Sequence, residues 1–143
     1  MSVDPRTLGW LARALTHEMS AVQQYLAQSV LARLWGDDTL AKTLRHEAVE
    51  ELAHAERLME VLIRQGVAPS AGNLAPARLG RTPGALLAAD HQLEVDAVRL
   101  YQQALAHATR MRDGETARLF SEILEEERAH VATLSDLSAG KHG

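Results

Sequence analysis

Glutamate and histidine residues recur in this sequence at a spacing suited to metal binding. Glu18 precedes the segment 51–54, Glu-Leu-Ala-His, by 33 residues (51 − 18 = 33). Glu94 precedes the segment 127–130, Glu-Arg-Ala-His, by the same interval (127 − 94 = 33). In a helix, residues three positions apart lie on one face, so each segment presents a carboxylate beside an imidazole. Both groups are ligands for divalent transition metals.

The two sets of residues belong to an internal repeat with an offset of 76 positions (94 − 18 = 76). The same offset relates further pairs of identical residues: Ala21 and Ala97, Val22 and Val98, Tyr25 and Tyr101, Glu50 and Glu126, and Leu58 and Leu134. The repeat predicts two similar helix pairs related by a pseudo-twofold axis. Such an axis would bring the two glutamates and the two Glu-x-x-His segments together.

Stop signals and hydrophobic periodicity predict an all-α chain with four helices in a single domain, 1–143. The helices are expected at about 5–35, 38–65, 83–112 and 114–138, with a crossover at 66–82 and a frayed tail after 138. Asp4-Pro5 and Thr82-Pro83 each combine an N-cap residue with a proline at the first helical position. Glycines at 36 and 66 are expected to end the first two helices.

The lengths of the connections predict the topology. The links between the first and second helices and between the third and fourth are very short, so each pair must be antiparallel. A helix of about 28 residues is roughly 42 Å long, and the sixteen residues 66–81 would span at most about 55 Å if extended. The 66–82 segment can therefore cross the whole bundle and leave the second and third helices parallel. One long crossover is the ferritin-like arrangement of a four-helix bundle.

Each predicted helix carries an apolar stripe that is interrupted near its middle by candidate ligands, as Leu15, Glu18 and Val22 illustrate in the first helix. One Glu-x-x-His segment alone would be consistent with a solvated helix face. Two at identical spacing, each within an apolar stripe, favour a buried site. Four buried carboxylates need cations, and two divalent ions would balance their charge. We therefore predict that two metal ions, iron or alternatively manganese, are bound by Glu18, Glu51, His54, Glu94, Glu127 and His130.

Composition excludes several other classes of site and partner. The chain has no cysteine, which rules out disulfides, iron–sulfur clusters and thiolate zinc sites. Its net charge is −4 and lysine occurs only at positions 42 and 141, so no nucleic-acid partner is expected. Neither a signal peptide nor a stretch long enough to span a membrane is recognisable, so a cytoplasmic protein with no membrane partner is expected.

The segments HEMSAVQQY (17–25), HEAVEELAHAERL (46–58) and EILEEERAH (122–130) resemble the bacterioferritin family. The resemblance extends over nearly the whole chain, to about residue 138. It implies that Glu51 and Glu127 bridge two irons, with Glu18 and His54 terminal on one side and Glu94 and His130 on the other. It also implies a ferroxidase that oxidises Fe²⁺ with O₂ or H₂O₂ and stores ferric mineral in a hollow homo-oligomeric shell.

Further residues match family positions. Tyr25 matches a tyrosine beside the di-iron centre, which implies hydrogen bonding to a ligand and electron donation; core packing is the alternative. His46 and Glu50 match an inner-surface iron site, for which a solvated helix face is the alternative. Trp35 also matches, and it can equally anchor the end of its helix.

Two departures from the family pattern change what is expected. Bacterioferritins place a haem-ligating methionine directly after the second-helix glutamate, where this chain has Leu52. Haem is therefore not expected in the usual way, and an altered haem site would have to use Met59 or Met19. The short fifth helix of the family is also missing, so a dodecamer is favoured over a 24-mer.

Other functions remain as alternatives to the storing ferroxidase. The same ligands would serve a peroxidase or a manganese catalase that stores no mineral, and a haem-binding mini-ferritin is a further alternative.

Overall fold

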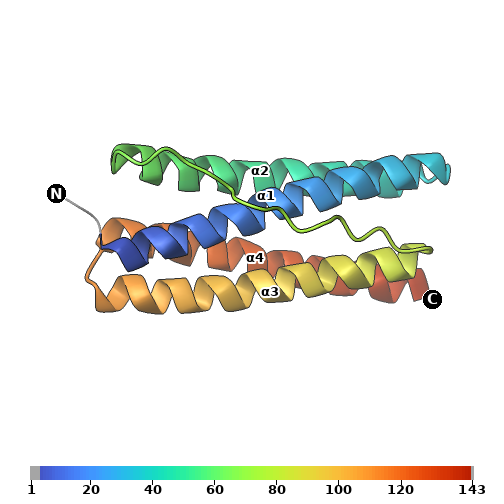
Figure 1. Cartoon of the computed structure of the whole chain (residues 1–143). Coiled ribbons are helices and arrows are strands. Elements are labelled where there is room, and N and C mark those ends of the chain that lie inside the picture. Colours follow the sequence, from blue (N-terminus) through green and yellow to red (C-terminus); the bar gives the residue numbers. More distant parts are fainter. Residues whose placement is uncertain (1–3, 143) are drawn as a thin grey trace.

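The computed structural model describes the backbone of residues 4–142 and the side chains of residues 4–138. Four α-helices form a bundle: α1 (Pro5–Leu34), α2 (Asp38–Arg64), α3 (Pro83–Arg110) and α4 (Gly114–His142). Helices α1 and α2 pack along their lengths as one antiparallel pair, and α3 and α4 as the other (Figure 1). The predicted all-α fold is confirmed, and no strand occurs within the described backbone.

The connection between α2 and α3 runs along the whole bundle. Figure 1 shows it leaving the end where α2 finishes, passing over α1 and reaching the opposite end, where α3 starts. Consequently α2 and α3 run in the same direction. The single long crossover expected from the sequence is therefore present, and none of the helices in the described chain is long and apolar enough to cross a membrane.

The helix starts have the expected chemistry. The carboxylate of Asp4 accepts a hydrogen bond from the Arg6 backbone N–H at 2.7 Å, and the Thr82 hydroxyl accepts one from Ala85 at 3.1 Å. These side chains pair backbone donors that the first helical turn leaves without partners. Gly36 follows α1 with φ of 82°, a left-handed conformation that glycine adopts without strain.

The last helix differs from its expected end. Instead of fraying after residue 138, α4 continues to His142. The segment 139–142 contains no proline, and a single glycine costs a helix only about 1 kcal/mol relative to alanine, so nothing in the sequence forces an earlier end.

The core consists of two apolar clusters separated by a polar layer at mid-height. The larger cluster contains Leu11, Leu15, Leu58, Tyr101, Phe120 and Ile123. The smaller contains Tyr25, Leu44, Leu86, Leu87 and Leu134. We call the part of the bundle built from residues 5–17, 55–64, 95–110 and 114–126 the apolar half, and the helical residues on the other side of the candidate ligands the polar half. The layer between them holds the candidate ligands.

Candidate metal centre

All six predicted ligands lie in the polar layer between the two halves. Glu18, Glu51, Glu94 and Glu127 are fully buried, and His54 and His130 are 4% and 7% exposed. One residue comes from α1, one from α3, and a Glu-x-x-His segment from each of α2 and α4. Each helix therefore turns its ligands toward the bundle axis at the place where its apolar stripe is interrupted.

The ligand atoms form two groups that share two residues. Within each group the potential ligand atoms lie no more than 4.8 Å from one another. The first group contains Glu18, Glu51, His54 and Glu127, and the second contains Glu51, Glu94, Glu127 and His130. Glu51 and Glu127 are the shared members, as the pseudo-twofold relation requires.

The atoms that face the centre lack hydrogen-bond partners. Eight buried ligand atoms have no hydrogen-bond partner. They are one carboxylate oxygen each of Glu18 and Glu94, both oxygens of Glu51 and Glu127, and Nδ1 of His54 and His130. His54 Nδ1 lies 3.1 Å from Glu127 Oε1, and His130 Nδ1 lies 3.0 Å from Glu51 Oε1, without hydrogen-bond angles. Unsatisfied buried polar atoms are rare in folded proteins. A set of converging oxygen and imidazole lone pairs fits two cations, which would supply the missing partners.

Outer carboxylates hold both imidazoles in position. His54 Nε2 lies 2.5 Å from Glu126 Oε2, and His130 Nε2 lies 2.5 Å from Glu50 Oε2. An Nε2–H that donates to a carboxylate leaves the Nδ1 lone pair free to face the centre. Glu50 also pairs with His46 at 2.8 Å, while Glu126 lies 3.9 Å from Arg57. Glu126 was not predicted as part of the centre, although the repeat relates it to Glu50 (126 − 50 = 76).

The two tyrosines of the repeat hydrogen-bond to the glutamates of the opposite helix. The Tyr25 hydroxyl donates to Glu94 Oε1 at 2.7 Å, and the Tyr101 hydroxyl donates to Glu18 Oε1 at 2.8 Å. Both rings are fully buried. Tyr25 was expected beside a ligand, whereas Tyr101 was not assigned to the site. Its signal was already present in the offset of 76 (101 − 25 = 76).

Burial and crowding shift the pKa values of the acidic groups in the layer. Burial, together with Glu18 and Glu94, raises the pKa of Glu51 well above its ordinary value. Burial and the neighbouring Glu127 likewise raise the pKa of Glu94. Burial alone would also raise the pKa of Glu127, but contacts with Glu94, His130 and His54 hold it below its ordinary value.

The imidazoles behave in the opposite sense. Burial alone would lower the pKa of both histidines, but the surrounding carboxylates, with Glu127 first, raise them. In the absence of cations the layer therefore keeps protons on its imidazoles and on some of its carboxyl groups. Metal binding requires deprotonated ligands and would release these protons.

A crevice gives access to the centre between α2 and α4, which contact each other less than α1 and α3 do. It has a volume of about 910 Å³ and is lined by residues of both helices, among them His54, His130, Glu50 and Glu126. His46 stands at this crevice with a side chain that is 68% exposed. Glu47, Glu50 and His130 form a third, smaller group of potential ligands there. The crevice connects solvent with the Nε2 sides of both imidazoles.

Comparison with known proteins identifies the family. A family model described as a ferritin-like domain matches residues 10–139. Bacterioferritin from Rhodobacter capsulatus is 30% identical over 131 residues, which cover 92% of this chain and 81% of that protein. Bacterioferritin from Brucella melitensis biotype 1 is 32% identical over 131 residues, which again cover 92% of this chain and 81% of that protein. This chain belongs to the bacterioferritin family.

A solved structure of the family has the same fold. The R. capsulatus bacterioferritin structure superposes with a TM-score of 0.94 at 29% sequence identity, covering 97% of this chain and 87% of that one. That structure is described as having a metal-free dinuclear site and a haem iron in a crystallographic special position. Members of the bacterioferritin family thus provide a precedent for both a dinuclear site and a haem.

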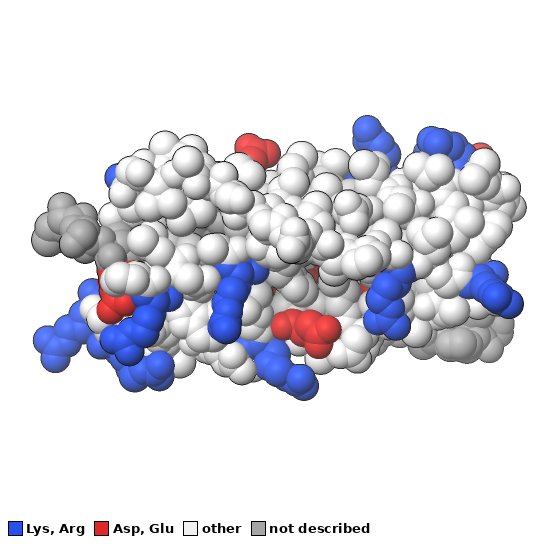
Figure 2. Space-filling view, in the orientation of Figure 1, with Lys and Arg blue, Asp and Glu red and all other residues white. Residues whose placement is uncertain are grey.

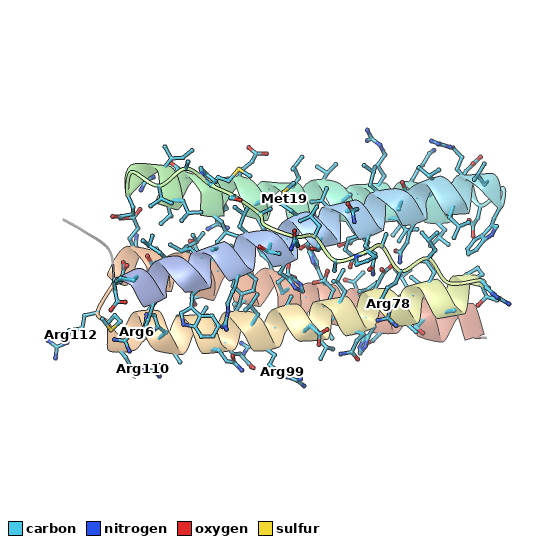
Figure 3. All side chains as sticks on the ribbon, in the orientation of Figure 1. Arg6, Met19, Arg78, Arg99, Arg110 and Arg112 are labelled. Carbon is cyan, nitrogen blue, oxygen red and sulfur yellow. The ribbon has the colours of Figure 1, made fainter. Side chains whose placement is uncertain are left out.

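The residues at the haem position of the family do not fit a haem iron here. Leu52, which replaces the family's methionine, is 41% exposed on α2 and has no atom able to ligate iron. Met19 and Met59 are partly buried and pack against the larger apolar cluster. Figure 3 labels Met19 on α1.

The basic residues do not form one extended surface in the view of Figure 2. Lys and Arg side chains stand singly or in small groups on this face. Arg6, Arg110 and Arg112 gather at the end of the bundle where α1 starts and α3 finishes (Figure 3). Arg78 and Arg99 stand apart from them (Figure 3).

Proposed function

We propose that this chain is a ferroxidase that binds two Fe²⁺ ions per subunit and oxidises them with O₂ or H₂O₂. The observation that carries the proposal is the pair of ligand groups that share Glu51 and Glu127 and converge with unpaired buried atoms. Membership of a family whose proteins in general oxidise and store iron supports it. We further propose storage of ferric mineral in a hollow cytoplasmic homo-oligomer.

The residues divide the work as follows. Glu18 with His54, and Glu94 with His130, would each hold one ion, and Glu51 and Glu127 would bridge them. Bound iron would supply the electrons for reducing the oxidant. Glu126 and Glu50 fix the imidazoles so that Nδ1 faces the centre. The Tyr25 hydroxyl orients Glu94 and stands within one hydrogen bond of a ligand, where it can donate an electron.

The metal is proposed from ligand chemistry. A sulfur-free set of four carboxylates and two imidazoles suits iron and manganese better than structural zinc. Manganese in the purified protein, with no iron loading, would instead support a catalase or a peroxidase that stores no mineral. Haem in the manner of the family is not part of the proposal, because Leu52 cannot ligate it.

The decisive experiment is stopped-flow oxidation of Fe²⁺ by O₂ after anaerobic loading. The wild type is expected to oxidise about two Fe²⁺ per chain in a fast phase, followed by slower mineral growth. Glu127→Ala should abolish the fast phase. Glu125→Ala is a matched control on the same helix, because Glu125 is exposed and pairs only with Arg128 in the described structure.

Two outcomes would contradict the proposal. A wild-type rate in the Glu127→Ala variant would remove the site from the reaction. An equal loss in the Glu125→Ala control would show that the effect is not local to the centre. Particle mass measured on the same samples tests the dodecamer against the 24-mer and checks that each variant assembles.

A further inference from the structure

Tyr101 is a buried phenol whose hydroxyl is directed at the metal centre. It lies on α3 with no exposed surface, and its Oη donates to Glu18 Oε1 at 2.8 Å. Tyr25 makes the equivalent contact with Glu94 at 2.7 Å from the other side of the pseudo-twofold axis. Each half-site therefore has one tyrosine within one hydrogen bond of its terminal carboxylate.

The packing of Tyr101 does not require its hydroxyl. The ring lies 5.9 Å from the Phe120 ring at an interplanar angle of 56°, a tilted aromatic contact that phenylalanine would also make. Around it stand Leu15, Leu58 and other members of the larger apolar cluster. The hydroxyl is thus the one polar atom that the ring carries into this cluster, and it points at Glu18.

A phenol in this position is suited to one-electron chemistry. Loss of an electron makes the phenol strongly acidic, so its oxidation needs a nearby base to receive the proton. Glu18 Oε1 lies within the distance at which proton transfer is direct. The apolar surroundings keep water away from the resulting radical. The same reasoning applies to Tyr25 and Glu94.

On the basis of the proposed ferroxidase function, we propose that Tyr101 is a second one-electron donor to the reaction, equivalent to Tyr25. Two Fe²⁺ ions alone supply two electrons, which reduce O₂ to H₂O₂. Two Fe²⁺ ions and two tyrosines supply four electrons, which reduce O₂ to water: 2 Fe²⁺ + 2 TyrOH + O₂ + 2 H⁺ → 2 Fe³⁺ + 2 TyrO• + 2 H₂O. Each tyrosine loses one electron and its hydroxyl proton, and two protons come from solvent. Further Fe²⁺, the substrate, reduces each radical back to tyrosine with uptake of one proton.

The test compares the wild type with Tyr25→Phe, Tyr101→Phe and the double variant. Rapid-freeze electron paramagnetic resonance measures the tyrosyl radical after Fe²⁺-loaded protein meets O₂, and a peroxide assay measures H₂O₂ released per Fe²⁺ oxidised. The wild type should release several-fold less H₂O₂ than the double variant, which should approach one H₂O₂ per two Fe²⁺. Each single variant should lose about half of the radical signal and release an intermediate amount of H₂O₂.

Binding of Zn²⁺, which has no redox chemistry, serves as the control for ligand geometry. Tyr101→Phe should still bind two Zn²⁺ per chain; loss of binding would make the hydroxyl a positioning group for Glu18 and overturn electron donation. Wild-type radical and peroxide yields in Tyr101→Phe would also overturn it, as would loss of the whole tyrosyl signal in Tyr25→Phe, since Tyr25 and Tyr101 are the two tyrosines of the chain. If the wild type binds Zn²⁺ but oxidises no Fe²⁺, the ferroxidase proposal fails and this inference fails with it. If the wild type oxidises Fe²⁺ rapidly and only the Tyr101→Phe results disagree, the ferroxidase proposal stands and this inference alone fails.

Discussion

The two halves of the bundle share their metal ligands but differ in what packs beyond them. In the polar half, Glu47 and Asp90 are buried four residues from a ligand, and Gln24 and Gln28 are buried six and ten residues from Glu18 (51 − 47 = 4, 94 − 90 = 4, 24 − 18 = 6, 28 − 18 = 10). At an offset of 76, their counterparts in the apolar half are Leu100, Ala104, Ile123 and Ala14, all hydrophobic. The apolar half has buried polar side chains too, Thr7, His107 and Thr116, but these lie near the far ends of their helices.

The crossover accounts for the glutamines among these buried polar residues. Gln28 Nε2 donates to the Arg78 carbonyl at 2.6 Å, and Gln24 Oε1 accepts from the Arg78 N–H at 3.2 Å. Ser20 accepts from the Ala75 N–H at 3.0 Å. Backbone polar groups packed on a helix need partners, and the crossover is the one element that occurs only once in the duplicated chain. Symmetry is therefore kept among the expected metal ligands and broken where Gln24 and Gln28 contact the crossover.

Asp90 is an acid placed within this asymmetric cluster. It is fully buried, and Gln24 Nε2 donates to its Oδ1 at 2.9 Å, while its Oδ2 has no partner. Burial raises its pKa to about 7 against the opposing effect of the Gln24 and Gln28 amides. A proton carried on Asp90 would remove the charge of this buried carboxylate, one oxygen of which has no hydrogen-bond partner.

The largest expected effect on stability is in the packing of the apolar half. Phe120→Ala should lower the free energy of unfolding by about 3–5 kcal/mol, because it removes a fully buried ring from the larger cluster. Leu44→Ala, at the equivalent position of the polar half (120 − 76 = 44), should lower it by less. Denaturant unfolding of metal-free protein measures both. A larger loss for Leu44→Ala would show that the apolar half is not the better packed one.

The second effect is confined to the polar half and depends on pH. A buried acid whose pKa is raised binds its proton more tightly in the folded state, so stability falls as pH rises from about 4 to about 7 and is then constant. Asp90→Asn mimics the protonated acid and should remove a contribution of up to about 4 kcal/mol to this fall. The variant should match the wild type near pH 4 and be more stable near pH 8.

Asp96→Asn is the matched control for Asp90→Asn, since Asp96 lies on the same helix, is exposed and accepts a hydrogen bond only from Gln92 in the described structure. Its unfolding free energy should follow the wild type at every pH. If the unfolding free energies of Asp90→Asn and the wild type change with pH in parallel, Asp90 does not bind its proton more tightly in the folded state. The polar half would then not differ from the apolar half by a buried protonated acid.

The third and smallest change in the free energy of unfolding is expected at two equivalent helix N-caps, where the two halves should respond alike. Asp37 caps α2 by accepting from the Leu40 N–H at 3.1 Å, and Asp113 caps α4 by accepting from the Thr116 N–H at 3.1 Å. Alanine at either position should lower the free energy of unfolding by about 1 kcal/mol. Unequal losses well beyond that size would show that the repeat is less symmetric at its helix starts than the distances indicate.

The features that the two halves share were predictable because the same residue types recur in the sequence at a fixed offset. The offset of 76 related Glu18 to Glu94 and His54 to His130. Helical periodicity then predicted that these residues lie on the apolar face of each helix. Caps such as Thr82 fixed the helix starts because their hydrogen bonds are local. Tyr101 was available from the same offset, and its role was missed because only Tyr25 had a match in the family pattern.

The unshared features were not predictable, because they depend on contacts between distant segments. Asp90 is one of several charged residues of α3, and it resembles a surface residue in the sequence until the crossover is placed over Gln24 and Gln28. The contact of His130 with Glu50 likewise joins α4 to α2 across the crevice, where no sequence spacing applies. The extension of α4 to His142 shows that weak stop signals do not determine where a helix ends.

Glu51 and Glu127 are proposed to be shared by two metal ions in one layer. Anomalous diffraction from crystals soaked anaerobically in Fe²⁺ tests it directly. We predict two iron peaks per chain, both adjacent to Glu51 and Glu127, one beside His54 Nδ1 and the other beside His130 Nδ1. A single peak in this layer, or iron only at the outer group of Glu47 and Glu50, would contradict the claim.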